Sequence, residues 1–227
     1  MKKLQKTSSV INLQLICKNF EIWNTKTSIL KNINLEIKAW EFVAIMWKSW
    51  SWKSTILNMI WLLDKPSSGK IFINWKNVAN LNDIEQAKIR LNTFWFIFQQ
   101  YNLIPWLTAY ENICLPLIFA DKKANYDEIK SYMEKVWIGD RINHKPLEMS
   151  WWEQQRVALL RALVNNPEII LWDEPTWNLD SQTWEKIMEI FVDLNKKQWK
   201  TIILVTHDPN VAKMANKIIK VKDWEIV

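Results

Sequence analysis

Lys53, Ser54 and Thr55 stand in the order that ends a phosphate-binding loop of the pattern G-x-x-x-x-G-K-[ST]. The lysine ammonium suits phosphate oxygens, and the serine hydroxyl suits Mg²⁺. The flanking glycines of this pattern would fall at Trp47 and Trp52, and both positions carry tryptophan. Such a loop turns backbone N–H groups inward around a phosphate, which requires residues without a Cβ. Three interpretations are therefore open. The stretch is unrelated to phosphate loops, it is a phosphate loop without activity, or its glycines are written as tryptophan.

The amino-acid composition favours the third interpretation. The chain contains 2 glycines and 17 tryptophans, whereas average usage predicts about 16 glycines in a chain of this length. Trp40, Trp75, Trp199 and Trp224 lie among polar neighbours where a turn is expected. We hypothesise that most or all of the tryptophans are glycine in the native protein, because some bacterial lineages read the UGA codon as glycine. The alternative, a tryptophan-rich protein, stays open.

A second candidate site is an apolar strand that ends in two carboxylates. Residues 169–172 lead directly to Asp173 and Glu174, which would place both acids at the strand edge where ligands bind in open α/β sheets. Adjacent residues of a strand point to opposite sides, so we expect different roles. Asp173 suits Mg²⁺ binding, and Glu174 suits deprotonation of an attacking water. Taken alone, the pair is equally consistent with a helix N-cap and surface charge.

The hydrophobic pattern predicts elements that would position these groups. Alternating residues in 10–22 and 33–37 indicate antiparallel strands with one solvated face, whereas the continuous apolar run 42–46 indicates a strand buried on both faces. That run leads into the phosphate-loop stretch, and a helix is expected over 55–63. We predict one α/β domain with a helical insertion. The further expected helices span about 125–136, 150–164 and 181–197, and the further strands 71–73, 169–171, 202–205 and 218–221.

Composition and charge indicate a globular protein. The longest apolar run without a charge, Ile113–Ala120, has 8 residues, whereas a membrane-spanning helix needs about 20. The basic N-terminus precedes no secretory apolar region, so we expect a cytoplasmic protein. Cys17 and Cys114 form no metal or disulfide pattern. The net charge of +6 is scattered along the chain, which is typical of solvated surface, although it would also suit anionic lipid headgroups or a polyanion.

With glycine in place of tryptophan, the sequence resembles the ATP-binding cassette (ABC) ATPases over nearly its whole length. Residues 47–55 would read Gly-Lys-Ser-Gly-Ser-Gly-Lys-Ser-Thr, a complete Walker A loop, and residues 150–156 would read Ser-Gly-Gly-Glu-Gln-Gln-Arg, the signature motif. Phe98-Gln99 is similar to the Q-loop, 178–180 to the D-loop, and His207 to the switch histidine. The resemblance implies a P-loop NTPase (RecA-like) core with an antiparallel β subdomain and an inserted α-helical subdomain. We expect one domain over 1–227, with the core at 1–98 and 165–227 and the helical subdomain at about 99–164.

The resemblance also implies residue roles. Glu174 would be the catalytic base, Gln99 would contact Mg²⁺ and the attacking water, and His207 would sense the γ-phosphate. Phe20 would stack on adenine, although an apolar residue at a strand end is also compatible with the core. The implied metal ligands are Ser54, Gln99 and Asp173. The implied nucleotide-binding set is Phe20, Trp47, Lys48, Ser49, Trp50, Ser51, Trp52, Lys53, Ser54, Thr55, Ser150, Trp151, Trp152, Glu153 and Asp180.

The partners implied by the resemblance are a second copy of the chain and a membrane permease. In the family, the helix that begins at Ser150 faces the ATP of the other subunit, so a head-to-tail dimer would enclose two Mg-ATP molecules. Residues 99–105, 108–112 and 173–180 are most similar to the branch that serves lipoprotein release and macrolide export. The chain would lie on the inner face of the cell membrane through its permease, and no nucleic-acid partner is expected.

Two alternatives to a transporter ATPase have the same fold but a different function. If the tryptophans are real, the chain would be a catalytically dead scaffold of the same fold, because indoles at 47, 50, 52, 151 and 152 would fill the phosphate pocket. Soluble ATPases of this fold that act in DNA repair or translation would need a long coiled coil or a second cassette, and 227 residues leave room for neither.

Overall fold

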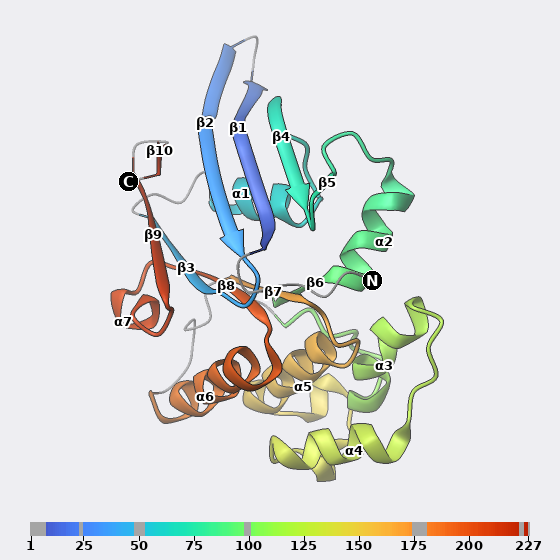
Figure 1. Cartoon of the computed structure of the whole chain (residues 1–227). Helices are drawn as coiled ribbons and strands as arrows, with labels where there is room; N and C mark the ends of the chain where they lie inside the picture. Colours follow the sequence, from blue (N-terminus) through green and yellow to red (C-terminus); the bar gives the residue numbers. More distant parts are fainter. Residues whose placement is uncertain are drawn as a thin grey trace.

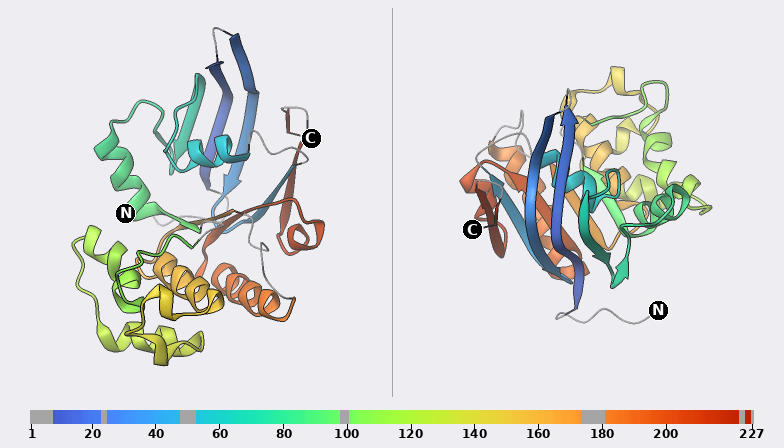
Figure 2. Two further views of the ribbon diagram at one scale, coloured as in Figure 1. Left: turned by 180° about the vertical axis from the view of Figure 1, so that it is seen from behind. Right: turned by 90° about the horizontal axis from the view of Figure 1, so that it is seen from above.

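The structure is a computed structural model that describes residues 8–22, 25–47, 53–97, 101–173, 181–222 and 225–226. Within these ranges the strands form an antiparallel sheet, ordered β2-β1-β4-β5, and a core sheet, ordered β10-β9-β3-β8-β7-β6. Helix α1 lies between the two sheets, and α5 and α6 cover the other face of the core sheet (Figures 1 and 2). The elements are β1 (Ser9–Ile22), β2 (Thr25–Lys38), β3 (Phe42–Trp47), α1 (Lys53–Ile60), β4 (Ser68–Ile73), β5 (Lys76–Asn77), α2 (Asp83–Thr93), β6 (Phe94–Ile97), α3 (Ala109–Phe119), α4 (Tyr126–Lys135), η1 (Gly139–Arg141), η2 (Pro146–Glu148), α5 (Trp151–Leu163), β7 (Ile169–Asp173), α6 (Ser181–Gln198), β8 (Thr201–Thr206), α7 (Pro209–Ala212), β9 (Lys217–Lys222) and β10 (Glu225–Ile226).

The central strands of the core sheet are buried on both faces. On β8, Ile203 and Val205 pack in one hydrophobic cluster with residues of α1 and the antiparallel sheet. Ile202 and Leu204 of the same strand pack in a second cluster with residues of α5 and α6. A strand in this position has no solvated face, so its sequence is apolar throughout rather than alternating.

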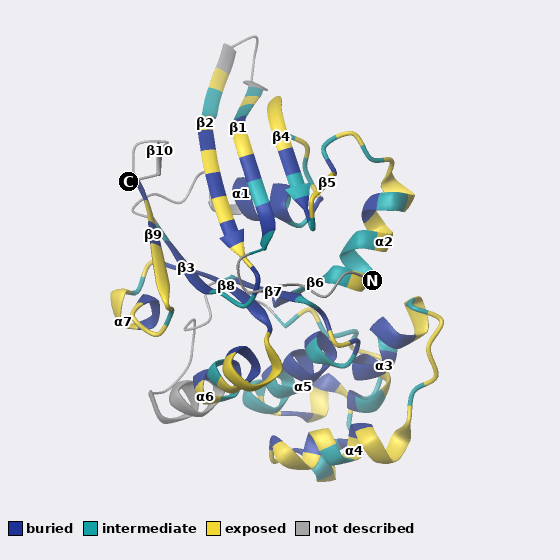
Figure 3. Ribbon diagram, in the orientation of Figure 1, coloured by how far each residue is buried: buried dark blue, intermediate teal, exposed yellow. Residues whose placement is uncertain are grey.

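The antiparallel sheet has one buried face and one solvated face. Ile11 and Leu13 of β1 are buried, whereas Asn12 between them is half-buried and Gln14 is exposed. The same alternation is visible along β2 (Figure 3). The pattern with a period of two predicted this arrangement, because successive side chains of a strand point to opposite faces.

Helices α3, α4 and α5 surround a third hydrophobic cluster, and we refer to them together as the helical subdomain. Ile113, Ile129, Met133 and Val157 are among the most deeply buried members of this cluster. A second face of α5 packs differently, because Leu159 and Ala162 belong to the cluster beneath the core sheet. Helix α5 therefore connects the helical subdomain to the core.

Some element boundaries differ from the sequence-based expectation. The helix expected over 55–63 runs from Lys53 to Ile60, and Leu62 just beyond it has a φ of 59°, which is incompatible with a right-handed helix. The strand expected at 33–37 is the end of β2, which pairs with β1 along its length. No helix in the described part of the chain is long and apolar enough to cross a membrane.

The turn between β4 and β5 shows a tryptophan in a backbone conformation that glycine favours. Ile73 pairs with Lys76, so the hairpin loop consists of Asn74 and Trp75. Both have positive φ, 46° and 64°, as in a type I′ turn, for which Asn-Gly is the preferred dipeptide. The Trp75 side chain is 54% exposed, so little packing compensates for the left-handed backbone.

Trp137 occupies a second such position, at the end of α4. Its N–H donates to the Glu134 carbonyl (3.0 Å), and the Ile138 N–H donates to the Met133 carbonyl (2.9 Å). This pair of bonds is the Schellman motif, whose left-handed residue is usually glycine, and Trp137 has a φ of 58°. Trp40 and Trp199 also have positive φ, 67° and 56°. These backbone angles support the hypothesis that tryptophan stands in place of glycine.

Replacing Trp75 by glycine is expected to raise the free energy of unfolding by about 1 kcal/mol, because a left-handed residue with a Cβ costs roughly that amount. Guanidinium denaturation of Trp75→Gly against the parent chain measures the change. Trp75→Ala is the matched control, since it removes the indole but keeps the Cβ. An equal gain in both variants would mean that the exposed indole, and not the backbone, is responsible.

Candidate functional site

The carboxyl ends of three neighbouring strands meet at one edge of the core sheet. In the parallel ladder β3-β8-β7, Met46 is opposite Thr206, and Asp173 is opposite Val205. The ends of β3, β8 and β7 at Trp47, Thr206 and Asp173 are therefore brought together. This edge is where an open α/β sheet binds ligands.

The stretch predicted to bind phosphate connects β3 to α1 at this edge. Helix α1 begins at Lys53, and Thr55 in its first turn is 7% exposed. The N–H groups of a first helical turn have no partners within the helix, and the helix dipole favours an anion there. Residues 48–52 lie outside the described residues, as do the side chains of Trp47, Lys53 and Ser54. That set includes the predicted nucleotide-binding residues Lys48, Ser49, Trp50, Ser51 and Trp52.

Asp173 and His207 lie at the same edge. Asp173 ends β7 and is half-buried, and His207 follows β8 and is exposed. The backbone around His207 is fixed on its C-terminal side. The Asp208 N–H donates to Thr206 Oγ1 (3.1 Å), and Asp208 Oδ1 accepts from the Asn210 N–H (2.7 Å), which caps α7. The other predicted residues Gln99, Glu174 and Asp180 lie outside the described residues.

Phe20, the predicted adenine-stacking residue, is held near the end of α1 by Lys18. The Lys18 ammonium lies 5.0 Å from the centre of the Phe20 ring. The same ammonium pairs with Asp64 Oδ1 (2.5 Å) and donates to the Lys65 carbonyl (2.8 Å). The side chains of Lys18 and Asp64 are 11% and 31% exposed, so the ion pair is partly shielded from water. Since Asp64 follows α1, this contact connects the aromatic ring to the helix that the phosphate loop precedes.

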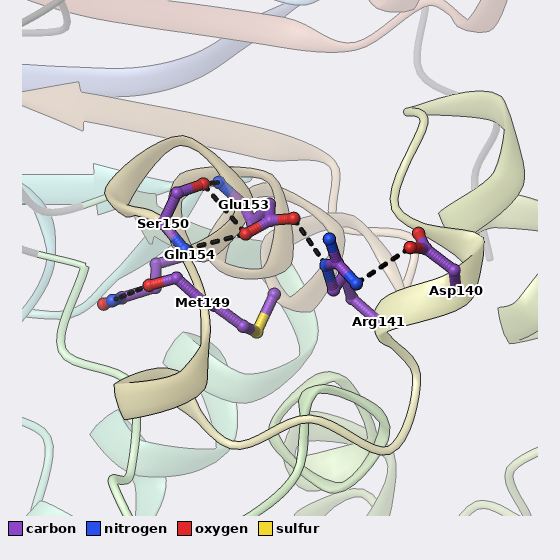
Figure 4. A network of polar contacts seen from close by, with 6 residues as sticks. All are labelled: Asp140, Arg141, Met149, Ser150, Glu153 and Gln154. Carbon is purple, nitrogen blue, oxygen red and sulfur yellow. Dashed lines mark hydrogen bonds and ion pairs between the residues drawn. The ribbon is translucent and has the colours of Figure 1, made fainter.

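The signature stretch caps α5 through a network of charged groups (Figure 4). The Ser150 N–H donates to Glu153 Oε2 (2.7 Å), and Ser150 Oγ accepts from the Glu153 N–H (3.4 Å). Arg141 Nε donates to Glu153 Oε1 (2.6 Å), and an Arg141 Nη pairs with Asp140 (2.9 Å). Burial alone would raise the pKa of Glu153, but the hydrogen bonds from Arg141 and Ser150 outweigh it and hold the pKa below its ordinary value. The carboxylate therefore stays charged and fixes the start of α5.

Two tryptophans occupy the first turn of α5. The rings of Trp151 and Trp152 stack with centroids 3.6 Å apart. Both residues follow the exposed Ser150 at the helix N-terminus. A first turn with small residues would leave its N–H groups accessible to an anion, whereas two stacked indoles place bulky apolar surface beside them.

Comparisons with known proteins agree with this arrangement. The family described as ABC transporter matches residues 30–177. The chain belongs to the ABC transporter family. It is 46% identical to the ABC transporter ATP-binding protein MJ0796 of Methanocaldococcus jannaschii, over 96% of this chain and 95% of that protein. It is 42% identical to the macrolide export ATP-binding/permease protein MacB of Bdellovibrio bacteriovorus, over 96% of this chain and 33% of that protein.

A solved structure of the same relative has the same fold as this cassette. The dimeric structure of MJ0796 in a post-hydrolysis state, bound to ADP and Pi, superposes with a TM-score of 0.86 at 46% identity and covers 95% of this chain and 96% of that one. The α/β fold with an antiparallel β subdomain and a helical subdomain is therefore confirmed, as is the ATPase class. The residue roles inferred from the motifs stay predictions.

Sequence reasoning missed several residues that organise the site of this cassette. Lys18 and Asp64 are 46 positions apart, and nothing in the local pattern indicates that they pair. Arg141 is likewise 12 positions from Glu153. The capping box at Ser150 was visible in the sequence because its partners are three residues apart, whereas these longer contacts depend on the fold.

Replacing Lys18 by methionine is expected to weaken ATP binding by about three-fold, the order of magnitude of one cation–π contact at a half-buried site. Methionine keeps an unbranched aliphatic side chain, so a loss of ATP affinity would report the ammonium charge that orients Phe20. Calorimetric titration of ATP into the chain with glycine at the tryptophan positions gives the dissociation constant. Lys70→Met, at an exposed lysine of β4, is the control and should bind ATP as the parent does. Equal affinity in Lys18→Met and its parent would refute the positioning role.

Proposed function

We propose that this cassette binds Mg-ATP at the carboxyl edge of the core sheet, hydrolyses it as a dimer, and drives a membrane permease. The observation that carries the proposal is the register of β3, β8 and β7, which brings the end of β3 at Trp47, Asp173 and the residue before His207 to one edge. The support from comparison is that the structure of the 46%-identical relative is bound to ADP and Pi.

In this proposal the groups at the sheet edge divide the work. Lys53 would bind the β- and γ-phosphates, Ser54 and Asp173 would hold Mg²⁺, and Glu174 would deprotonate the attacking water. Gln99 would contact the metal and the water, and His207 would sense the γ-phosphate. The half-buried Asp173 carboxylate fits Mg²⁺, because this ion binds through one or two protein oxygens together with phosphate oxygens and water. Bound Mg²⁺ would neutralise charge that develops on the phosphate oxygens.

A second copy of the cassette completes each ATP site in this proposal. Ser150 is exposed at the start of α5, and the network through Glu153 and Arg141 fixes that helix terminus. An exposed, rigid helix N-terminus is suited to the phosphates of a nucleotide held by the opposite subunit. The dimeric structure of the M. jannaschii relative supports this assembly.

The proposed membrane partner is a permease of the exporter or lipoprotein-release type. Support comes from MacB, whose printed name combines an ATP-binding part with a permease, and of which this cassette spans a third. The M. jannaschii relative, of which this cassette covers 95%, is named as an ATP-binding protein without a permease part. On that support we infer a permease on a separate chain, and we propose that the cassette lies at the cytoplasmic face of the membrane through it. No nucleic-acid partner is proposed.

ATP hydrolysis by this cassette depends on glycine at the tryptophan positions. Four described tryptophans have left-handed backbone angles, at positions 40, 75, 137 and 199, and the phosphate loop itself requires glycine for its chemistry. If the tryptophans are real, the same fold serves as a scaffold without turnover. Activity measurements separate the two possibilities.

The chain with glycine at all 17 tryptophan positions is expected to hydrolyse ATP, whereas the chain as written is not. Within the glycine form, Glu174→Gln should lower kcat by at least about 100-fold, because it removes the general base, while ATP affinity is retained. Phosphate release and ATP titration measure the two quantities. Glu168→Gln, at an acid beside the start of β7, is the control and should leave kcat unchanged. A Glu174→Gln variant as fast as its parent would disprove the assignment of the base.

The native protein is expected to contain glycine at positions such as 47, 50 and 52 of the loop. Peptide masses of protein purified from its source organism measure this directly, because each replacement lowers the mass by the difference between the two residues. Peptides with tryptophan at these positions would refute the recoding hypothesis and favour the scaffold.

A further inference from the structure

The segment from Tyr101 to Thr108 connects β6 to α3 without forming a helix or strand. It follows directly after residues 98–100, which contain the predicted Gln99. Two buried side chains from the helical subdomain hold this segment, one near each end. We call residues 101–108 the connecting segment.

Arg161 of α5 holds the first end. Its two terminal nitrogens donate to the carbonyls of Asn102 (2.8 Å) and Tyr101 (2.7 Å), which lie 59 and 60 positions away in the chain. The residue is 9% exposed, and burial lowers the pKa of the guanidinium to about 10, so it remains charged at neutral pH. A forked guanidinium can donate to two adjacent carbonyls at once, which a lysine ammonium cannot reproduce with the same geometry.

Asn112 of α3 holds the other end. Its side-chain NH₂ donates to the carbonyls of Ile104 (3.1 Å), Leu107 (3.1 Å) and Thr108 (3.0 Å). Its side-chain oxygen accepts from the Ile104 N–H (2.8 Å). The residue is fully buried, with 0% exposure. The connecting segment is thus bonded to α5 at its start and to α3 at its end.

The helices that hold the segment also pack against each other. Ile113 and Leu117 of α3 share a hydrophobic cluster with Val157 and Leu160 of α5. Helix α5 begins beside Ser150, and Arg161 lies about three turns further along the same helix. A displacement of the N-terminus of α5 therefore carries Arg161, and with it the carbonyls of Tyr101 and Asn102.

The surroundings of Arg161 are mostly apolar, although Lys88 and Arg90 also line them. Arg161 and Asn102 lie in the wall of a cavity of about 760 Å³ between α2, β6 and α3, whose other lining residues include Leu91, Phe94, Leu115 and Phe119. A buried cation in such a place costs desolvation that two neutral carbonyls only partly offset. A hydrophobic residue of similar size would pack there without that cost, but it could not hold the two carbonyls.

We propose that Arg161 is a positioning residue that fixes the backbone following Gln99 to the signature helix, with Asn112 fixing the far end of the same segment. The inference rests on the proposed ATPase function. In the dimer, closure of the Ser150 end of α5 on the partner's nucleotide would set the position of the connecting segment, and so the chain that leads to Gln99. Arg161 does not touch ATP. It would affect the chemical step while leaving ATP binding by Phe20 and the phosphate loop intact.

The kinetic test compares variants of the glycine form. Arg161→Met should lower kcat at least about ten-fold while KM for ATP changes less than two-fold, because the lost contact acts on turnover and not on binding. Asn112→Ala should show the same split, and Arg161→Lys should recover part of kcat. The control is Asn195→Ala, since Asn195 is also buried and donates to two backbone carbonyls, those of Trp40 (2.9 Å) and Lys200 (2.8 Å). Its kcat should stay at the parent value at matched folded fraction.

A purely structural role for Arg161 predicts a different outcome. If Arg161→Met and Asn195→Ala lower kcat equally at matched folded fraction, the proposal is wrong. Amide hydrogen exchange in the chain as written provides a readout that needs no activity. Exchange in the peptide covering 101–104 should rise in Arg161→Met and not in Asn195→Ala, and an unchanged rate would overturn the proposal. If the parent glycine form binds but does not hydrolyse ATP, the ATPase function fails, and the exchange result still decides whether Arg161 fixes the segment.

Discussion

The parallel pairing of β3, β8 and β7 is the constraint on which the rest of the structure depends. Because the strands run in the same direction and in fixed register, their carboxyl ends meet at one edge. Each strand is covered on both faces, by α1 and the antiparallel sheet on one side and by α5 and α6 on the other. A slip of one residue in the pairing of a strand would exchange the side chains on its two faces, so the packed core fixes the register. The groups at the edge are positioned by that register.

Helix α5 extends that constraint beyond the sheet. One face packs beneath the core strands through Leu159 and Ala162, and another face packs against α3 and α4 through Val157 and Leu160. The capped end at Ser150 and the buried Arg161 lie on this one rigid element. The helix thus relates two places that are remote in the sequence, the signature stretch and the start of the connecting segment.

The sequence allowed the fold class and the site edge to be predicted because both depend on local patterns. The apolar run 42–46 and the acids after residue 172 identify buried strands with functional ends, and Ser150 with Glu153 identifies a helix start. The contacts of Lys18 with Asp64 and of Arg161 with Tyr101 could not be predicted in this way. Each joins residues more than 40 positions apart, and a lysine or arginine in an amphipathic segment is ordinarily solvated surface.

The tryptophans divide into two groups by what the backbone and the packing require. Trp75 and Trp137 hold left-handed angles at turns and are more than half exposed, so the indole contributes little and the Cβ is a cost. Trp172 is different, because it is 3% exposed in β7 and its ring lies 4.2 Å from that of Phe191. A glycine there would leave space beside Phe191 that neighbouring side chains of α6 would have to fill. The evidence for glycine therefore comes from the left-handed turns and from the chemistry of phosphate binding. It extends to Trp172 only because a codon reassignment would apply to every tryptophan position.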